Sequence, residues 1–401
     1  MSSTRTLLTA LSPLAAGVLI WTANDTAVAR GRAPRMGEPL RGLTAEERQL
    51  FLAGKEKFEA VEDADDGLGP IFNGTSCVIC HGIPATGGSS PQNETRAQLF
   101  DGTNHFDLPG GSLFQSLAVS PDCAEAVPPN ANVIAPRQST PLFGSGLIEA
   151  VPDRSIERYA ALQARNHPEQ AGRIHRVVDA ASGVTRVGRF GWKAQQATLL
   201  SFSADAYLNE MGITNHVFPR ENAPNGDQSR LAACDTVPDP EDEDGDFELF
   251  AHYMRLLAPP PVEDERSGRR LRGRRGKQGR DVSGRIGFER VGCAVCHYDR
   301  YQARSPIRAI GGTTVKAFSD FLLHDVGTGD GIVQGGAGAN ELRTPPLWGL
   351  RESAPYLHDG SAPTIGEAIR RHANQGAAAR DAFDRLSPDE QEALLEFLNA
   401  I

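Results

Sequence analysis

Apolar residues recur at three- and four-residue spacing in several segments of the chain, a pattern typical of amphipathic helices. Three of these segments begin with a capping box, in which a Ser or Thr precedes a Glu by three positions. The capping pairs are Thr44 with Glu47, Thr364 with Glu367, and Ser387 with Glu390. The helices that they predict cover about residues 45–60, 365–375 and 388–399.

Two further segments are predicted to be helical, and strand signals are few and short. Residues 192–211 are helical in composition and stop at Gly212. A helix over residues 246–258 would end at the run of three prolines that follows. Hydrophobic residues make up 39% of the chain, which also holds 42 Gly and 27 Pro, so we expect long loops. The pattern predicts a mainly α fold with long loops and few short strands.

The first 29 residues have the form of a secretory signal peptide. Arg5 supplies the positive start, residues 7–21 the apolar stretch, and residues 27–29 the small-residue cleavage site. The alternative is a membrane anchor, but Pro13 interrupts the apolar stretch, which is shorter than the roughly 20 residues of a spanning helix. No later segment is long and apolar enough to span a membrane. We therefore expect a soluble protein of the periplasm or another extracytoplasmic compartment.

The motif Cys-x-x-Cys-His occurs twice and uses four of the six cysteines. It is the attachment signature of c-type haem, in which two thiols add to the haem vinyl groups and the histidine binds the iron. A partial zinc site is the alternative, but neither copy has further cysteine or histidine ligands nearby. The spacing therefore predicts two covalently bound haem c groups. Their attachment residues are Cys77, Cys80 and His81, and Cys293, Cys296 and His297.

Cys123 and Cys234 are the two cysteines outside these motifs. In an oxidising compartment two remaining cysteines most often pair, and a disulfide would close a long loop. Two separate buried thiols are the alternative.

The two motifs lie too far apart for one small cytochrome domain, so the chain is predicted to contain a duplicated unit. Weak sequence similarity supports this, because residues 137–144 after the first motif are similar to residues 343–349 after the second. We predict two cytochrome c-like haem domains. The boundaries are 1–29 for the signal peptide, 30–258 for the N-terminal haem domain, 259–284 for a Pro-rich and basic linker, and 285–401 for the C-terminal haem domain.

The chain is acidic, with a formal net charge of −10 at pH 7, so it lacks the basic footprint of a nucleic-acid-binding protein. The local basic run at residues 266–280 is either a solvated loop or a docking patch for an acidic electron-transfer partner. The acidic run at residues 241–246 is either a calcium site or a helix start. It lacks the full spacing of a twelve-residue calcium loop.

Six segments together resemble the bacterial di-haem cytochrome c peroxidase and MauG superfamily. The resemblance is to its di-haem oxidoreductase branch, also called thiol oxidoreductases, and it covers nearly the whole mature chain. The segments are residues 188–195, 209–212, 293–297, 318–325, 343–347 and 355–360.

The resemblance implies ligands for both irons. His81 and His297 would be the proximal ligands, as the motif spacing already predicts. The family's second haem takes a methionine fourteen residues after the histidine of a Tyr-x-His-Asp-Gly turn, and here that position is His372. A second haem with two histidine ligands is implied, although His372 could also be a surface residue. His324 and His358 could simply form hydrogen bonds in turns beside the haem.

The resemblance also implies that the first haem is reactive. Glu210 would be its acid and base, and Trp192 would lie between the haems, although it could equally be a core residue. An unbroken helix would set these two residues about 27 Å apart. We therefore expect a break near residues 201–205. His105 and Met211 are candidates for a second protein ligand of the first haem iron.

The sequence thus predicts a periplasmic di-haem c-type oxidoreductase with peroxidase-like activity. A small redox protein or cytochrome would donate electrons to the C-terminal haem, and peroxide would be reduced at the N-terminal one, with no nucleic acid and no stable membrane span. The alternatives are an electron-transfer cytochrome without catalysis, or MauG-like oxidation of a partner protein. Thiol oxidation has no free cysteine pair to support it.

Overall fold

The computed structural model describes residues 32–261 and 277–401. The predicted signal peptide and most of the basic run lie outside the described residues. Residues Ala33–Ile401 form one packed unit. The domain boundaries given above stay a prediction.

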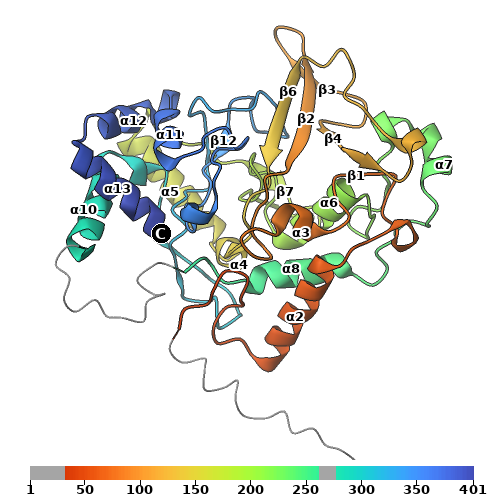
Figure 1. The fold of residues 1–401 in the computed structure, drawn as a ribbon, viewed down its shortest axis with the longest axis horizontal. Coiled ribbons are helices and arrows are strands. Elements are labelled where there is room, and N and C mark those ends of the chain that lie inside the picture. The colour runs from red at the N-terminus through yellow and green to blue at the C-terminus, as the bar shows by residue number, and fades with distance from the viewer. Residues whose placement is uncertain (1–31, 262–276) are drawn as a thin grey trace, which may run out of the picture. The chain divides into compact units, whose positions relative to one another are not determined.

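The secondary structure is mixed, with 35% helix and 14% strand, so the prediction of a mainly α fold is wrong. The principal sheet pairs β2 (Asn93–Phe100) with β6 (Val133–Gln138) along most of their length, and both strands are antiparallel (Figure 1). β3 (His105–Asp107) and β4 (Leu113–Phe114) also pair with β2. The sequence concealed these strands because β2 lacks an apolar alternation and β6 contains Pro136.

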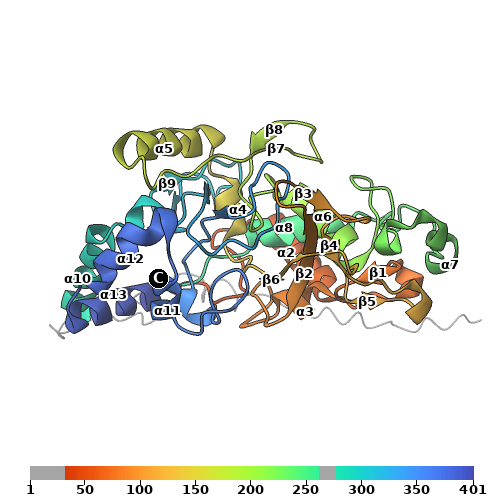
Figure 2. The ribbon, with the colours of Figure 1, turned by 90° about the horizontal axis from the view of Figure 1, so that it is seen from above.

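The remaining strands form four two-stranded ribbons, each antiparallel. They are β1 (Ile71–Phe72) with β5 (Leu117–Ala118), β7 (Arg176–Val178) with β8 (Thr185–Val187), β9 (Tyr301–Gln302) with β10 (Thr314–Val315), and β11 (Leu323–His324) with β12 (Leu342–Arg343). Figure 2 shows β7 and β8 beside α5 (Asp153–Asn166), away from the principal sheet.

Longer helices pack in two groups, each beside one of the two Cys-x-x-Cys-His segments. The first group is α2 (Ala45–Glu59), α6 (Leu199–Met211) and α8 (Asp246–Leu256), and the second is α10 (Lys277–Arg290) with α13 (Pro388–Ala400). The shorter α-helices are α3 (Cys77–His81), α4 (Ser145–Glu149), α7 (Leu231–Cys234), α11 (Ile365–Arg370) and α12 (Ala377–Asp384). Single 3-10 turns cover Ala64–Asp66, Pro121–Cys123, Pro224–Gly226, Gln228–Arg230, Cys293–Val295, Leu350–Glu352 and Asn374–Gly376.

The helices predicted from capping boxes are present. Both reciprocal cap bonds form at the starts of α2 and α13. α11 is shorter than predicted and ends at Arg370, and Asn374 has a positive φ of 44° that a continuing helix could not contain. α6 begins only at Leu199, where Thr198 caps it, so the predicted helix over residues 192–211 was too long.

Close helix packing recurs in the two groups through one glycine in each. A Cβ atom at Gly54 of α2 would lie 2.2 Å from the backbone oxygen of Leu249 in α8. One at Gly284 of α10 would lie 2.2 Å from the backbone oxygen of Ala393 in α13. Any side chain at either position would therefore push the two helices apart.

Each of these glycines is followed four residues later by a phenylalanine that lies beside a motif histidine. The ring centroids of Phe58 and His81 are 6.2 Å apart, and those of Phe288 and His297 are 6.4 Å apart, with nearly equal tilts of 53° and 52°. The two halves therefore support their histidines in the same way, as a duplicated unit predicts.

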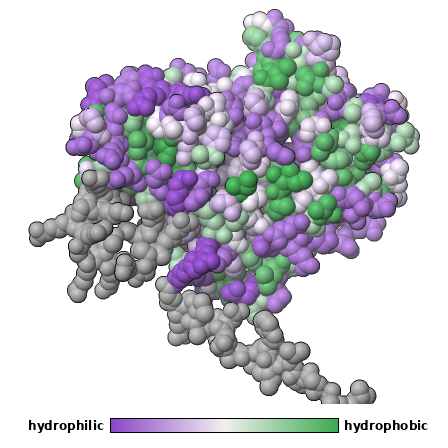
Figure 3. Space-filling model, viewed as in Figure 1, coloured by the Kyte–Doolittle hydropathy of each residue, from purple (hydrophilic) through white to green (hydrophobic). Residues whose placement is uncertain are grey.

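The disulfide between Cys123 and Cys234 forms as predicted, with Cα atoms 5.7 Å apart. Within residues 32–261 and 277–401, no helix is both long and apolar enough to cross a membrane. On the face seen in Figure 3, hydrophobic residues gather at the tip of the principal sheet, where Phe100, Phe106 and Ile134 are exposed.

Candidate functional site

The first Cys-x-x-Cys-His segment forms the short helix α3, which lines a cavity that we call the first cavity. Its histidine is oriented by the backbone, because His81 Nδ1 lies 3.0 Å from the oxygen of Gly88. Burial lowers the pKa of His81, so the ring is neutral near pH 7. With Nδ1 donating to a carbonyl, Nε2 keeps a free lone pair for a metal.

The second segment forms a 3-10 turn that lines a second cavity, and its histidine is held in the same way. His297 Nδ1 lies 2.9 Å from the oxygen of Phe318, and burial lowers the pKa of His297 to about 4. The two motif histidines are thus equivalent neutral imidazoles, each with Nε2 free, and their role as iron ligands stays a prediction.

His372 lines the second cavity together with His297. It lies just beyond the end of α11 rather than on that helix as predicted, and it is half-buried rather than a surface residue. Its Nδ1 is 2.8 Å from the oxygen of Ala368, and burial lowers its pKa. His372 is therefore a second neutral imidazole with a free Nε2 in this cavity.

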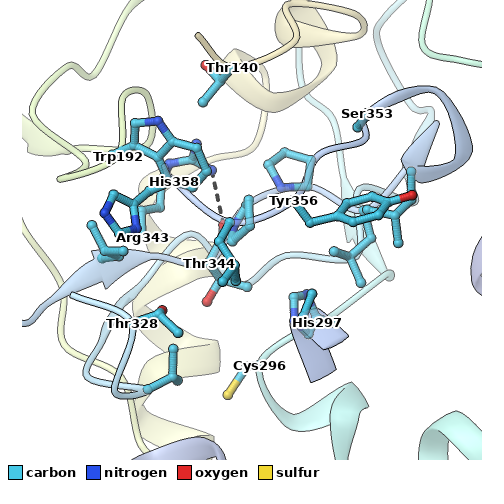
Figure 4. Close-up of a pocket in the computed structure, with 18 of the residues that line it drawn as sticks. Thr140, Trp192, Cys296, His297, Thr328, Arg343, Thr344, Ser353, Tyr356 and His358 are labelled. Atoms are coloured by element: carbon cyan, nitrogen blue, oxygen red, sulfur yellow. Dashed lines mark hydrogen bonds between the residues drawn. The ribbon is translucent and has the colours of Figure 1, made fainter. Parts of the chain in front are cut away.

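Two other histidines line the second cavity. His324 Nε2 lies 2.9 Å from Asp320, and although burial opposes it, this carboxylate raises the pKa of His324 to about 11. An imidazolium paired in this way has no free nitrogen lone pair to offer a metal. His358 lies on the opposite side of the cavity from Cys296 and His297 (Figure 4), and its Nδ1 is buried without a partner.

Trp192 lies between the two cavities and lines both of them. Its indole Nε1 donates to the oxygen of Gln138 at 2.8 Å, and its own oxygen accepts from the backbone N of Arg343 at 2.7 Å. Gln138 and Arg343 belong to the two similar segments that follow the motifs, so both halves hold this tryptophan. Its ring also makes an edge contact with His358, at a centroid distance of 6.2 Å.

A buried charge cluster fixes the loop that carries Trp192. Lys193 Nζ lies 2.8 Å from one oxygen of Asp330, and Arg137 Nε donates to the other at 2.7 Å. The side chains of Lys193 and Asp330 are fully buried, and that of Arg137 is 2% exposed. Burial alone would raise the pKa of Asp330, but the two cations lower it. Sequence reasoning did not find this cluster, because its members are far apart along the chain.

Glu210 lies in the last turn of α6 and lines the first cavity, together with Trp192. Asn73 Nδ2 donates to Glu210 Oε2 at 2.8 Å. Burial, and then the nearby charge of Glu94, raises the pKa of Glu210 to about 8. The carboxyl group of Glu210 therefore holds a proton at pH 7.

Glu94 and Arg96 on β2 complete this part of the first cavity, and the sequence analysis missed both. Arg96 donates to the two oxygens of Glu94 at 2.8 and 3.1 Å. Burial opposes ionisation, but Arg96 lowers the pKa of Glu94, which also shares a hydrogen bond with Glu210. A carboxylate and a carboxylic acid thus face each other. The signal in the sequence was the alternation of Glu94, Arg96 and Gln98 on one strand.

The chain break that Trp192 and Glu210 require does occur, but not at residues 201–205. Trp192 lies in a loop before α6, so the two residues can line one cavity without a kinked helix. His105 lies on β3 and does not line the first cavity, whereas Met211 does. Of the described histidines, only His81 lines this cavity.

Comparison with solved structures finds distant likenesses at low identity. Hydrazine synthase of Kuenenia stuttgartiensis is 15% identical, with 99% of this chain and 100% of that chain covered and a TM-score of 0.42. A MauG-like protein associated with microbial copper homeostasis is 15% identical, covering 92% and 91%, with a TM-score of 0.41. The diheme peroxidase BthA from Burkholderia thailandensis is 15% identical, covering 88% and 85%, with a TM-score of 0.43.

None of the curated proteins compared with this chain matches it. A family model does match, over residues 92–401, and its description is "Di-haem oxidoreductase, putative peroxidase". This match spans most of the chain and includes Trp192, Glu210 and the second motif. The chain therefore belongs to the di-haem oxidoreductase family, whose members carry two haems, and it is an oxidoreductase of the peroxidase kind.

Proposed function

We propose that the chain is a periplasmic c-type di-haem peroxidase that reduces peroxide in its first cavity and receives electrons through its second. One observation carries the proposal: Trp192 lines both cavities, whereas the pair of Glu94 and Glu210 lines only the first. The periplasmic location rests on the signal-like first 29 residues. The disulfide between Cys123 and Cys234 supports an oxidising compartment.

The residues of both cavities fit a covalently attached haem. Each cavity presents the two free cysteines of its motif and a neutral motif histidine whose Nε2 is available. Burial raises the pKa of the Cys77 and Cys293 thiols to about 12 in each case, so both thiols are protonated at neutral pH. The side-chain oxygen of Ser203, in the lining of the first cavity, is buried without a partner.

The two cavities assign different roles to the two haems. Cys77 and Cys80 would attach the first, with His81 as its iron ligand, and Cys293 and Cys296 the second, with His297 and His372 as ligands. When bound, the haems would supply redox-active irons, the second receiving electrons from a small redox protein or cytochrome and the first reducing peroxide. His372 closes the second site, and no described histidine closes the first.

Glu94 and Glu210 in the first cavity would accept and donate the protons of this reaction. Reducing hydrogen peroxide breaks its O–O bond and consumes two electrons and two protons to give two water molecules. Glu210 holds a proton near neutral pH and would donate it from its carboxyl group to the leaving oxygen. Glu94, kept anionic by Arg96, would accept a proton from the bound peroxide. Asn73 would orient Glu210 through the bond to Oε2.

Steady-state peroxide reduction by a Glu210→Gln variant tests this role. The amide preserves size and polarity but cannot exchange a proton, so turnover should fall by about 10² to 10⁴. Haem content should stay at two per chain. Glu56→Gln makes the same substitution on the exposed face of α2, away from either cavity, and should leave turnover unchanged. Unaltered turnover of Glu210→Gln would remove Glu210 from the mechanism.

An electron carrier without catalysis is the second candidate, and one observation favours it. Met211 lines the first cavity beside Glu210, and a methionine thioether is an iron ligand in electron-transfer cytochromes. A Met211→Leu variant distinguishes the two functions. If Met211 closes the first iron, this variant should gain peroxide binding, whereas a peroxidase should bind peroxide with or without the methionine.

A further inference from the structure

Four carboxylates gather in the loop between α6 and α8, away from both cavities. Glu221, Asp235, Asp239 and Glu241 each place one oxygen within 4.8 Å of the others. Only Glu241 belongs to the acidic run for which the sequence left calcium or a helix start open. Asp242 from that run accepts bonds from the backbone N atoms at the start of α8, so this part of the run begins a helix.

Glu221 is the member of the cluster that most needs a partner. It is 7% exposed, and its Oε1 accepts a bond from the backbone N of Asn222 at 2.7 Å. Its Oε2, by contrast, is buried with no hydrogen-bond partner. A buried carboxylate oxygen without a hydrogen-bond donor costs free energy. Here that oxygen belongs to a cluster whose other three members are also carboxylates.

Other oxygens of the cluster accept hydrogen bonds from neutral donors. The backbone N of Thr214 donates to Glu241 Oε2 at 2.7 Å, and its hydroxyl donates to Asp239 Oδ1 at 2.7 Å. Among the described residues, none of the four carboxylates forms an ion pair with a lysine, arginine or histidine. The negative charge of the cluster is thus not balanced by a described side chain.

We propose that Glu221, Asp235, Asp239 and Glu241 bind one divalent cation of the calcium class. Calcium takes oxygen ligands at 2.3–2.6 Å, so opposite ligands lie about 4.6–5.2 Å apart, which accommodates the separation of up to 4.8 Å in this cluster. Magnesium gives up its water reluctantly and usually binds through one or two carboxylates, so a site of four carboxylates favours calcium. Carboxylate oxygens alone also match a hard cation rather than a transition metal.

The ion would connect the loop to the helix that carries Glu210. Asn222, next to Glu221, donates through Nδ2 to Asn209 Oδ1 at 3.1 Å, and Asn209 precedes Glu210. Asp235 directly follows Cys234 of the disulfide. One cation would therefore join three points of this loop and stabilise the end of α6.

Calcium titration of the haem-loaded full chain, after removal of divalent ions with EDTA, tests the site. We expect one Ca²⁺ per chain by calorimetry and metal analysis, a higher Tm with Ca²⁺, and a weaker response to Mg²⁺. Glu221→Gln should weaken Ca²⁺ binding by about tenfold or more, because it removes an anionic ligand. Glu243→Gln removes the same charge from an exposed position in the acidic run, and its affinity should stay unchanged.

Three results would overturn the proposal. They are no Ca²⁺ binding by the intact chain, equal affinity in Glu221→Gln and the parent, or an equal loss in Glu243→Gln, which would indicate general attraction to an acidic surface. If Glu221→Gln does not fold, Asp235→Asn serves instead, since that side chain is half-buried. It should show the same loss of affinity, and unaltered binding by a folded Asp235→Asn protein would count equally against the site.

Discussion

The two cavities begin with the same attachment motif and differ in what faces it. In both, a motif histidine is held through Nδ1 by a backbone oxygen and supported by a phenylalanine from a helix with a close-packing glycine. In the second cavity, His372 supplies another neutral imidazole. The first cavity instead contains the carboxylic acid of Glu210 and the carboxylate of Glu94. We propose that the residues opposite the common motif give the two cavities different roles.

The largest expected effect comes from removing one attachment motif at a time. Replacing Cys77 and Cys80 by serine should lower the haem content from two to one per chain and abolish peroxide reduction. Replacing Cys293 and Cys296 should also leave one haem, but the remaining site should still bind peroxide. The pyridine haemochrome assay measures the haem content, and the peroxide difference spectrum measures binding. Equal behaviour of the two double variants would contradict the unequal roles.

Removing the His372 imidazole should make the haem of the second cavity resemble that of the first in its spin state. His372→Ala removes the imidazole proposed as the second ligand of the second haem, so the ferric haem should change from low spin to high spin. Electron spin resonance at low temperature detects this change. His105→Ala is the matched control, because His105 lines neither cavity and should not alter the spectrum.

Buried charges hold the loop that carries Trp192, which lines both cavities. Asp330→Asn leaves Lys193 and Arg137 without their anion in a buried site and should lower the free energy of unfolding by about 3–5 kcal/mol. Thermal or urea unfolding of the haem-loaded protein measures the loss. The exposed Asp244→Asn change should have almost no effect. A small effect at Asp330 would mean that the Trp192 loop is held by other contacts.

The last expected effect is a pH dependence of stability that comes from Glu210 in the first cavity. Glu210 has a folded pKa of about 8, above that of an unfolded glutamate, so its folded form keeps a proton that the unfolded form releases. This group therefore stabilises the fold least at high pH, and stability is lost as pH rises from about 4.5 to 8. Unfolding measured across this range should show a smaller loss of stability in Glu210→Gln than in the parent. The peroxide-reduction rate should also fall as pH rises through about 8.

Local features of this protein could be predicted from the sequence, and long-range ones could not. The attachment motifs, the capped helices and the disulfide each depend on nearby residues or on few possible pairings. The β2–β6 sheet was missed because β2 lacks large apolar residues at alternate positions and β6 contains Pro136. Glu94 and Arg96 were missed with it. Trp192 and Glu210 were chosen by resemblance, and only the structure shows that they line one cavity.

The electron spin resonance spectrum of the ferric, haem-loaded protein tests the central claim most directly. We expect one low-spin haem, bound by His297 and His372. The other haem should be high spin, bound by His81 and open on the side of Glu210. Peroxide should perturb the high-spin signal. Two low-spin haems, with no response to peroxide, would contradict the division of roles between the cavities.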